Sequence, residues 1–227
     1  MNDIRGQLLP VYVLADESGS MALHMGDLNA GLASLHQALL GEPLVASKVR
    51  FSVIGFSDDV SERLPMVDLR FVEAIPRLAA SSTTSYQAAF TDLLTRIPRD
   101  VQALKAQQYQ VHRPAVFFLS DGQPTDDDDE DWLAAHARLT DRTVTRAAPN
   151  IIAFGIGDAE PGAILQVATR SDFAYVSIPG ANVGDSIAKF STELTHSIVT
   201  SAATLGTHQP QLQVSPPQGF TLAIDVV

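Results

Sequence analysis

The sequence contains no cysteine among its 227 residues. This absence excludes disulfide bonds, thiolate metal sites, iron–sulfur clusters and a cysteine nucleophile. Basic residues are also scarce, because 15 Lys and Arg stand against 26 Asp and Glu, which gives a net charge of −11. Nucleic acids and anionic membranes attract basic surfaces, so the composition argues against both as partners.

The sequence also lacks a long hydrophobic run. Its first apolar stretch, residues 8–15, is interrupted by Pro10 and followed by Asp16, and it is too short to span a membrane. A basic run before this stretch and a clear cleavage site after it are both missing, which argues against a secretory signal. We therefore expect a cytoplasmic protein.

Short apolar runs, some of them rich in β-branched and aromatic residues, predict several buried strands. The expected strands cover residues 9–15, 49–57, 60–67, 115–120, 151–156 and 173–178. A turn composition, Ser57-Asp58-Asp59, separates the second strand from the third. We expect these two strands to form an antiparallel hairpin at one edge of the sheet.

Between the strands, apolar residues recur at offsets of three and four, which predicts amphipathic helices. The expected helices contain residues 25–39, 86–97, 132–139 and 187–198. Pro98 is expected to end the second helix, with a further helical piece over residues 100–108. This alternation predicts a doubly wound α/β fold: a mostly parallel central sheet with one antiparallel edge strand, and helices on both faces.

The composition changes near residue 205, where a Pro- and Gln-rich tail begins. We therefore expect one domain over residues 1–204 and a tail over residues 205–227. Apolar residues alternate with others over residues 220–226, which predicts a terminal strand. Leu212 and Val214 are its expected hairpin partner.

Three polar loops supply oxygen atoms that could bind a metal ion. The candidate ligands are Asp16, Ser18 and Ser20 in the first loop, Thr83 or Thr84 in the second, and Asp121 in the third. Ligand sites of such sheets lie at the carboxyl ends of the strands, where we expect these loops to meet. Hard cations such as Mg²⁺ prefer carboxylate and hydroxyl oxygens. Without nitrogen or sulfur ligands, Zn²⁺ and Cu²⁺ are disfavoured.

These loops carry a resemblance to a known family. Residues 11–21 (VYVLADESGSM) resemble the first strand and the Asp-x-Ser-x-Ser loop of a von Willebrand factor A domain. Residues 117–122 (FFLSDG) resemble the strand of that family that ends in Asp-Gly. The resemblance extends over residues 8–200 in the order of the elements, and it implies the same doubly wound fold.

The threonine loop, residues 82–90 (STTSYQAAF), departs from the family pattern. The family usually has glycine before the threonine and again three residues after it, where this chain has Thr83 and Gln87. Matching Ala89-Phe90 to the Ala-Leu of the family selects Thr84 as the ligand, with Thr83 as the alternative.

The resemblance implies a metal-ion-dependent adhesion site that binds Mg²⁺, or Mn²⁺ or Ca²⁺. Ser18, Ser20 and Thr84 would lie at or near the ion, and Asp16 and Asp121 would bind it directly or through water. One coordination position would stay open for an Asp or Glu of a protein partner. The implied function is metal-dependent protein binding. We expect no enzymatic activity, because the motifs place no paired nucleophile and base at the strand ends. Within the family, residues 52–57 and 120–126 look most like the bacterial TerY-like branch, which is associated with tellurium-resistance and stress operons.

Other interpretations of these residues stay open. The chain could be a metal-dependent hydrolase, or an interaction scaffold whose metal site is vestigial. Asp16, Ser18 and Ser20 could form only a turn and a helix cap, and Thr84 could cap the next helix.

Three further polar features lie near the candidate ligands. The acidic run over residues 126–131 is interpreted as a solvated helix start, since acids there favour the helix dipole, with a second cation site as the alternative. Glu17 is expected at the rim of the site. His24 could line the rim too, although ordinary surface exposure is the expected state.

Overall fold

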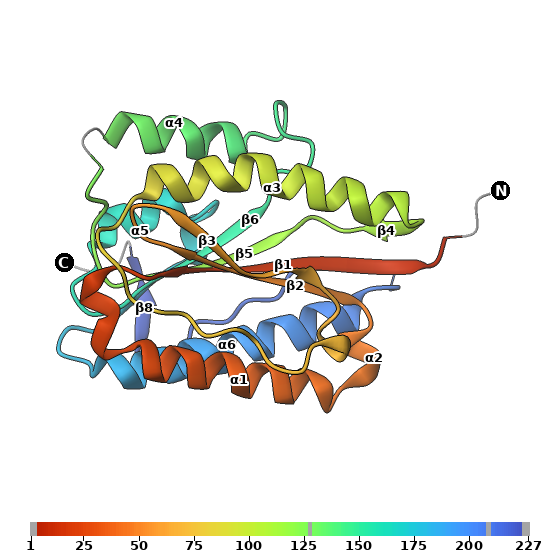
Figure 1. Ribbon diagram of the computed structural model, residues 1–227, viewed down its shortest axis with the longest axis horizontal. Coiled ribbons are helices and arrows are strands. Elements are labelled where there is room, and N and C mark those ends of the chain that lie inside the picture. The colour runs from red at the N-terminus through yellow and green to blue at the C-terminus, as the bar shows by residue number, and fades with distance from the viewer. Residues whose placement is uncertain (1–3, 127–128, 208–209, 224–227) are drawn as a thin grey trace.

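A computed structural model describes residues 4–126, 129–207 and 210–223 of the chain. A mixed sheet runs through its centre (Figure 1). The strands, in spatial order, are β3 (Val60–Val67), β2 (Val49–Phe56), β1 (Gly6–Asp16), β5 (Ala115–Ser120), β6 (Asn150–Gly155), β7 (Ala174–Ser177) and β8 (Phe220–Leu222). The five strands from β2 to β7 in this order are parallel, and β3 pairs antiparallel with β2 at the edge, as predicted.

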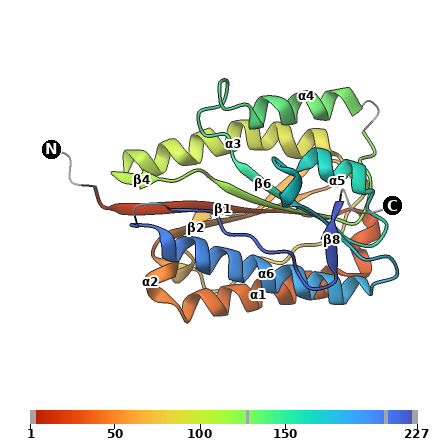
Figure 2. The same cartoon turned by 180° about the vertical axis from the view of Figure 1, so that it is seen from behind.

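Helices cover both faces of this sheet, which confirms the predicted doubly wound α/β fold (Figures 1 and 2). One face carries α3 (Tyr86–Ala106), α4 (Asp129–Thr140) and α5 (Pro161–Val167), and the other carries α1 (Met25–Leu40), α2 (Pro43–Ala46) and α6 (Val183–Thr204). Short 3-10 turns lie at Gly19–Leu23, Leu69–Phe71 and Ser171–Phe173. Among the helices of the described residues, none has the length and apolar character needed to cross a bilayer.

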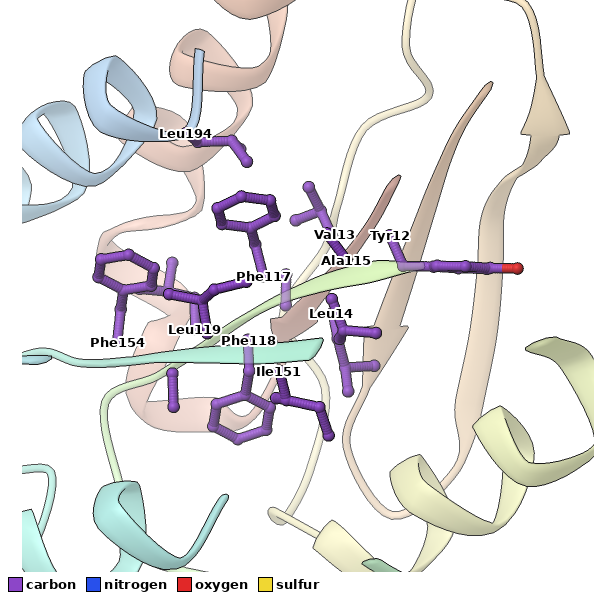
Figure 3. Packing of buried hydrophobic residues seen from close by; sticks show 14 of the residues in the cluster. Tyr12, Val13, Leu14, Ala115, Phe117, Phe118, Leu119, Ile151, Phe154 and Leu194 are labelled. Atoms are coloured by element: carbon purple, nitrogen blue, oxygen red, sulfur yellow. The ribbon is translucent and has the colours of Figure 1, made fainter. Parts of the chain in front are cut away.

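The core follows from alternating side chains on strands that are buried on both faces. Phe117 points toward Leu194 of α6, and the neighbouring Phe118 points to the opposite face (Figure 3). Phe118 stacks on Phe56 with 5.3 Å between the ring centroids, and it meets Tyr86 of α3 edge-on at 5.1 Å. The same packing that stabilises the sheet therefore anchors α3, which begins directly after the threonine loop.

The expected helix break at Pro98 is wrong, because α3 continues through it as one helix. An internal proline costs roughly 3 kcal/mol. Pro98 faces solvent, whereas Val101 and Leu104 beyond it are buried. Each buried side chain of that kind stabilises by about 1.5–3 kcal/mol, so the two together offset the proline.

Among the described helices and strands, three short ones lie outside the sequence prediction. Strand β4 (Tyr109–Val111) pairs parallel with residues Gly6 to Leu8 at the start of β1, α2 follows α1, and α5 follows β6. All three are too short for hydrophobic periodicity to reveal them.

Strand β3 is an irregular edge. Its pairing with β2 shifts register between Phe51 and Ile54. It contains Pro65, which is exposed, and charged residues at Glu62 and Arg63. An edge of this kind presents an interrupted row of backbone hydrogen-bonding groups.

At the other edge, the tail contributes β8, which pairs antiparallel with β7. Leu222 lies opposite Tyr175, and the ring of Phe220 meets that of Phe154 at 6.0 Å. The expected hairpin with residues 212–214 is wrong, because β8 pairs with β7 and not with those residues. Residues 224–226 of the expected strand lie outside the described residues.

We expect the backbone amides of β8 that bond to β7 to exchange with solvent at least about tenfold more slowly than an unfolded chain, because opening them requires local unfolding. Hydrogen exchange followed by mass spectrometry or NMR measures this. Exchange at unfolded-chain rates throughout residues 220–222 would show that the tail does not pack on the sheet.

Candidate metal site

The first loop of the site begins where β1 ends, at Asp16. The Asp16 side chain is fully buried, with 0% of its surface exposed. The backbone N–H of Ser18 donates to Asp16 Oδ1 at 2.8 Å. A 3-10 turn then starts at Gly19, and this tight turn brings Ser18 and Ser20 to the same side of the loop, with 3.0 Å between their hydroxyl oxygens.

The second carboxylate, Asp121, follows β5, the neighbour of β1 in the sheet. Ser20 Oγ donates to Asp121 Oδ1 at 2.8 Å. Because that hydroxyl proton is used, the Ser18 hydroxyl donates to Ser20 in turn. The structure therefore brings Asp16, Ser18, Ser20 and Asp121, more than a hundred residues apart at the extremes, into one short chain of polar contacts.

Sequence reasoning missed Ser120 as a residue of this site. Ser120 is buried, and its hydroxyl donates to Asp16 Oδ2 at 2.5 Å. Each oxygen of Asp16 therefore accepts one hydrogen bond, which fixes the carboxylate in place. The signal was available, because Ser120 is the hydroxyl residue that ends β5 directly before Asp121.

The threonine loop lies against the first loop. The N–H of Gly19 donates to the carbonyl of Ser82 at 3.0 Å. Thr84 is buried, whereas Thr83 is exposed and its N–H donates to Asp58 at 3.1 Å. Within the described residues, no hydrogen bond joins the Thr84 side chain to the other four candidate ligands. The burial of Thr84 on the inner side of the loop favours it over Thr83.

The loop after β5 braces the threonine loop. Thr125 donates from its backbone N–H to the carbonyl of Thr84 at 2.8 Å and accepts from the Thr84 N–H through its hydroxyl at 3.0 Å. The Asp126 carboxylate accepts from the Ser85 hydroxyl at 2.6 Å and from the Tyr86 N–H at 2.8 Å. These bonds tie the second and third loops together.

The role of Asp126 differs from the predicted one. It caps the first turn of α3, where a negative charge also complements the helix dipole, instead of belonging to a solvated start of the next helix. The pattern could not show this, because the partner helix begins forty residues earlier. Asp127 and Asp128 lie outside the described residues.

The two carboxylates lie in an environment that disfavours their charges. Burial raises the pKa of Asp16 to about 6, against hydrogen bonds from Ser120 and Ser18 that lower it, and the charge of Asp121 raises it further. Burial also raises the pKa of Asp121, while the hydrogen bond from Ser20 and the nearby His24 lower it. Among the described residues, no Lys or Arg forms an ion pair with either carboxylate.

This donor set fits a hard divalent cation. In the described part of the chain, no three His, Cys, Asp or Glu side chains converge to hold a metal, so an ion here would need the hydroxyl oxygens as well as the two carboxylates. Two carboxylates and neighbouring hydroxyls are the oxygen donors of Mg²⁺, Mn²⁺ or Ca²⁺. A cation would also offset the penalty of bringing two acids together in a buried place.

The expected position of Glu17 at the rim is wrong. Glu17 is 2% exposed, and it forms a forked ion pair with Arg63 of β3, with the closest N–O distance 2.8 Å. The N–H of Ala79 also donates to it at 2.9 Å. Gly55 makes room, since a Cβ there would lie 2.0 Å from Glu17 Oε2.

His24 stands at the start of α1, half-buried and close enough to Asp121 for its charge to lower the pKa of that carboxyl. This placement brings His24 nearer to the site than the ordinary surface position expected from the sequence. His24 therefore lies near the carboxylate that follows β5.

No model of a known protein family and no curated protein sequence matches this chain. Solved structures do resemble it. A von Willebrand factor type A protein from Catenulispora acidiphila superposes with a TM-score of 0.59 at 15% identity, covering 85% of this chain and 43% of its own. The pilus adhesin SpaC from Lactobacillus rhamnosus GG gives 0.65 at 12% identity, covering 86% and 31%.

A third structure is proximal thread matrix protein 1 from the mussel byssus, with a zinc-occupied MIDAS motif. It gives a TM-score of 0.59 at 14% identity, covering 86% of this chain and 48% of its own. This chain thus spans less than half the length of each of these three proteins. At such low identity the likeness shows the fold alone: the chain has the fold of von Willebrand factor A domains.

Proposed function

We propose that this chain is a metal-dependent protein-binding module. A divalent cation, Mg²⁺ or else Mn²⁺ or Ca²⁺, binds at Asp16, Ser18, Ser20, Thr84 and Asp121, and an Asp or Glu of a partner protein completes its coordination. The observation that carries this proposal is the convergence of Asp16 and Asp121 with two serine hydroxyls at the carboxyl ends of β1 and β5. The zinc-occupied motif in the mussel protein of the same fold supports it.

The charge balance of the site explains why a partner carboxylate would bind. The two acids supply two negative charges, and the other donors are neutral hydroxyls. A divalent ion held in this way keeps electrophilic character toward an additional anionic oxygen. Six ligands satisfy Mg²⁺, and the chain supplies about five, so a free domain would complete the shell with water.

The rim adds a feature that a partner could contact. Leu23 lies in the turn between the first loop and α1, and 89% of its surface is exposed. It adjoins His24 in sequence. An acidic side chain flanked by apolar residues would therefore match both the ion and its immediate surroundings.

We also propose that the module has no catalytic activity of its own. Hydrolysis at such a site needs a base placed to activate water or a nucleophile. The neutral hydroxyls of Ser18 and Ser20 lie in a chain that ends on Asp121. Within the described residues, no base accepts a proton from them except the carboxylates that would hold the ion.

The purified protein should therefore release no product above background from generic phosphoesters or esters in the presence of Mg²⁺ or Mn²⁺. Chromogenic substrates such as p-nitrophenyl phosphate and p-nitrophenyl acetate measure this directly. Turnover that disappears in the Asp16→Ala variant would contradict the non-enzymatic proposal and support the hydrolase alternative.

The biological setting is proposed from the sequence resemblance. Residues 52–57 and 120–126 resemble the TerY-like branch, so we propose a role in a bacterial stress or tellurium-resistance system and a location in the cytoplasm. Partner capture from a lysate of such a bacterium, with release by EDTA, would test the setting. Capture that persists in EDTA would show that the partner does not bind through the ion.

Thermal unfolding with added metal tests the assignment of the threonine. At a metal concentration ten times the dissociation constant, binding stabilises by ~1.4 kcal/mol, which corresponds to a rise of ~3–6 °C in Tm. Thr84→Ala should reduce this rise, because a hydroxyl at the ion is lost. Thr83→Ala is the matched control and should leave the rise nearly unchanged, since Thr83 is exposed. The reverse pattern would assign the role to Thr83.

A further inference from the structure

A pocket of about 520 Å³ lies at the amino ends of the strands, away from the candidate metal site. We call it the arginine pocket, and it is lined by Arg113, Arg142, Arg170 and Asn150, with Leu9 and Phe173 among its apolar walls. No Asp or Glu is among the described residues that line it. In a chain with a net charge of −11, three arginines facing one pocket require an explanation.

The topology of the sheet produces this gathering. Arg113 precedes β5, Asn150 is the first residue of β6, and Arg170 stands directly before the 3-10 turn that leads into β7. Because these strands are parallel neighbours, the segments before them lie side by side. The C-terminal end of α6 and the segment after it close the pocket on one side.

The three arginines differ in their acidic partners. Arg170 forms a forked ion pair with Asp172, with the closest distance 2.6 Å. Among the described residues, no carboxylate lies within ion-pair distance of Arg113 or Arg142. Burial and the charge of Arg142 both lower the pKa of Arg113, so the two cations repel each other in the free protein.

Both side chains contact neutral groups. Arg113 donates to the carbonyl of Ala148, and Arg142 lies 3.5 Å from the side-chain oxygen of Asn150. Guanidinium N–H groups that are not used in these contacts stay available in the pocket. A guanidinium presents five donors in a rigid fork and suits a phosphate or carboxylate group.

We propose that the arginine pocket binds a phosphate monoester that carries an apolar or aromatic body. A phosphate monoester has a charge of about −1.5 to −2 at neutral pH and would neutralise both unpaired arginines, whereas a single carboxylate neutralises only one. The pocket falls within the ~300–1,000 Å³ of small-molecule sites and is larger than inorganic phosphate needs. Leu9 and Phe173 are almost fully buried beneath the pocket, so the accessible apolar surface for the rest of the ligand comes from Pro210, which is exposed, and Leu212, which is half-buried.

Isothermal titration calorimetry with adenosine monophosphate as the probe tests this proposal. The protein is first freed of divalent metal on a chelating resin, and chloride at equal ionic strength serves as the reference. We expect adenosine monophosphate to bind at least about tenfold more tightly than inorganic phosphate, because the apolar walls contact only the larger ligand. Equal binding of the two, or binding of neither, would overturn the proposal.

Variants locate the site. Arg142→Gln should weaken binding of adenosine monophosphate about 10- to 100-fold, because a hydrogen bond between charged groups is lost. Arg142 is exposed, so this variant should fold even if Arg113→Gln does not. Arg138→Gln is the matched control, since Arg138 is an exposed arginine of α4 outside the pocket, and should change the affinity less than about twofold. Undiminished binding by Arg142→Gln would show that the ligand lies elsewhere.

The metal site can be separated from this result. Asp121→Ala should retain full binding of adenosine monophosphate, because Asp121 lies at the opposite ends of the strands. Loss of binding in that variant would assign the phosphate to the metal site instead. Phosphate binding at the arginine pocket is thus measured separately from metal binding at the opposite ends of the strands.

Discussion

Replacing Asp121 by alanine should abolish the response of the protein to divalent metal. The variant loses one of the two charged groups at the site, and we expect metal affinity to fall about 100-fold or more. At a Mg²⁺ or Mn²⁺ concentration that raises the Tm of the wild type by ~3–6 °C, the variant should then shift by less than about 1 °C. Differential scanning fluorimetry with and without EDTA measures both shifts, and EDTA should reverse that of the wild type.

Asp158→Asn is the matched control for this experiment. Asp158 is exposed and near enough to raise the pKa of Asp121, but it is not among the proposed ligands. Its removal should weaken metal binding only slightly, because an exposed charge at a distance is screened by solvent. If Asp121→Ala keeps the full metal-induced rise in Tm, the metal binds elsewhere. If both variants lose the rise equally, the metal is attracted by the overall negative charge and is not bound by Asp121.

Replacing Asp16 by asparagine should stabilise the metal-free protein at neutral pH. The folded protein raises the pKa of Asp16 to about 6, from 3.8 for a free aspartate. Each pKa unit corresponds to 1.36 kcal/mol, so the ionised carboxylate costs roughly 3 kcal/mol in the folded state. The amide keeps an acceptor for the Ser18 N–H, and the Ser120 hydroxyl can turn toward the carbonyl of Gly122, 3.4 Å away. We expect a gain of about 1–3 kcal/mol in the free energy of unfolding.

The sign of the pH dependence follows from the same shift. An acid whose pKa is higher in the folded state is destabilising when ionised, so the penalty is absent below pH 4, grows toward pH 6 and is complete above it. The advantage of Asp16→Asn should therefore be present at pH 7.5 and shrink toward pH 4. Urea denaturation of both proteins at the two pH values, after removal of metal, measures it.

Two outcomes complete the Asp16 experiment. Added Mg²⁺ should stabilise the wild type and leave Asp16→Asn nearly unaffected, because the amide carries no charge to hold the ion. A variant that is less stable than the wild type at pH 7.5 without metal would mean that the carboxylate is needed for folding, and that its charge is not the source of strain.

The strand ends that carry the site could be predicted from the sequence for a clear reason. Strands buried on both faces appear as continuous apolar runs, and the first charged residue after each run marks the strand end: β1 ends at Asp16, and β5 ends one residue before Asp121. Because parallel strands end at the same edge of a sheet, Asp16 and Asp121 had to be near each other once the fold was known.

The groups that brace the site could not be predicted in this way. Glu17 pairs with Arg63, 46 positions away, and Asp126 caps a helix that begins 40 positions earlier. Neither contact leaves a local pattern, because each depends on how loops from separate strands pack together. The same applies to β8, because the 22-residue helix α6 separates it in the chain from its partner β7.

The irregular edge at β3 limits how any partner can associate with this fold. An extended peptide adds to a sheet by pairing with a regular row of backbone N–H and C=O groups. Pro65 removes one donor from β3, the pairing with β2 shifts register, and Glu62 and Arg63 place charges along the strand. These three features of β3 oppose edge-to-edge association and amyloid-like stacking. The β3 edge is therefore unsuited to recruiting an extended segment of another chain as an additional strand, which leaves the loops at the strand ends, and not this edge, as the place for recognition.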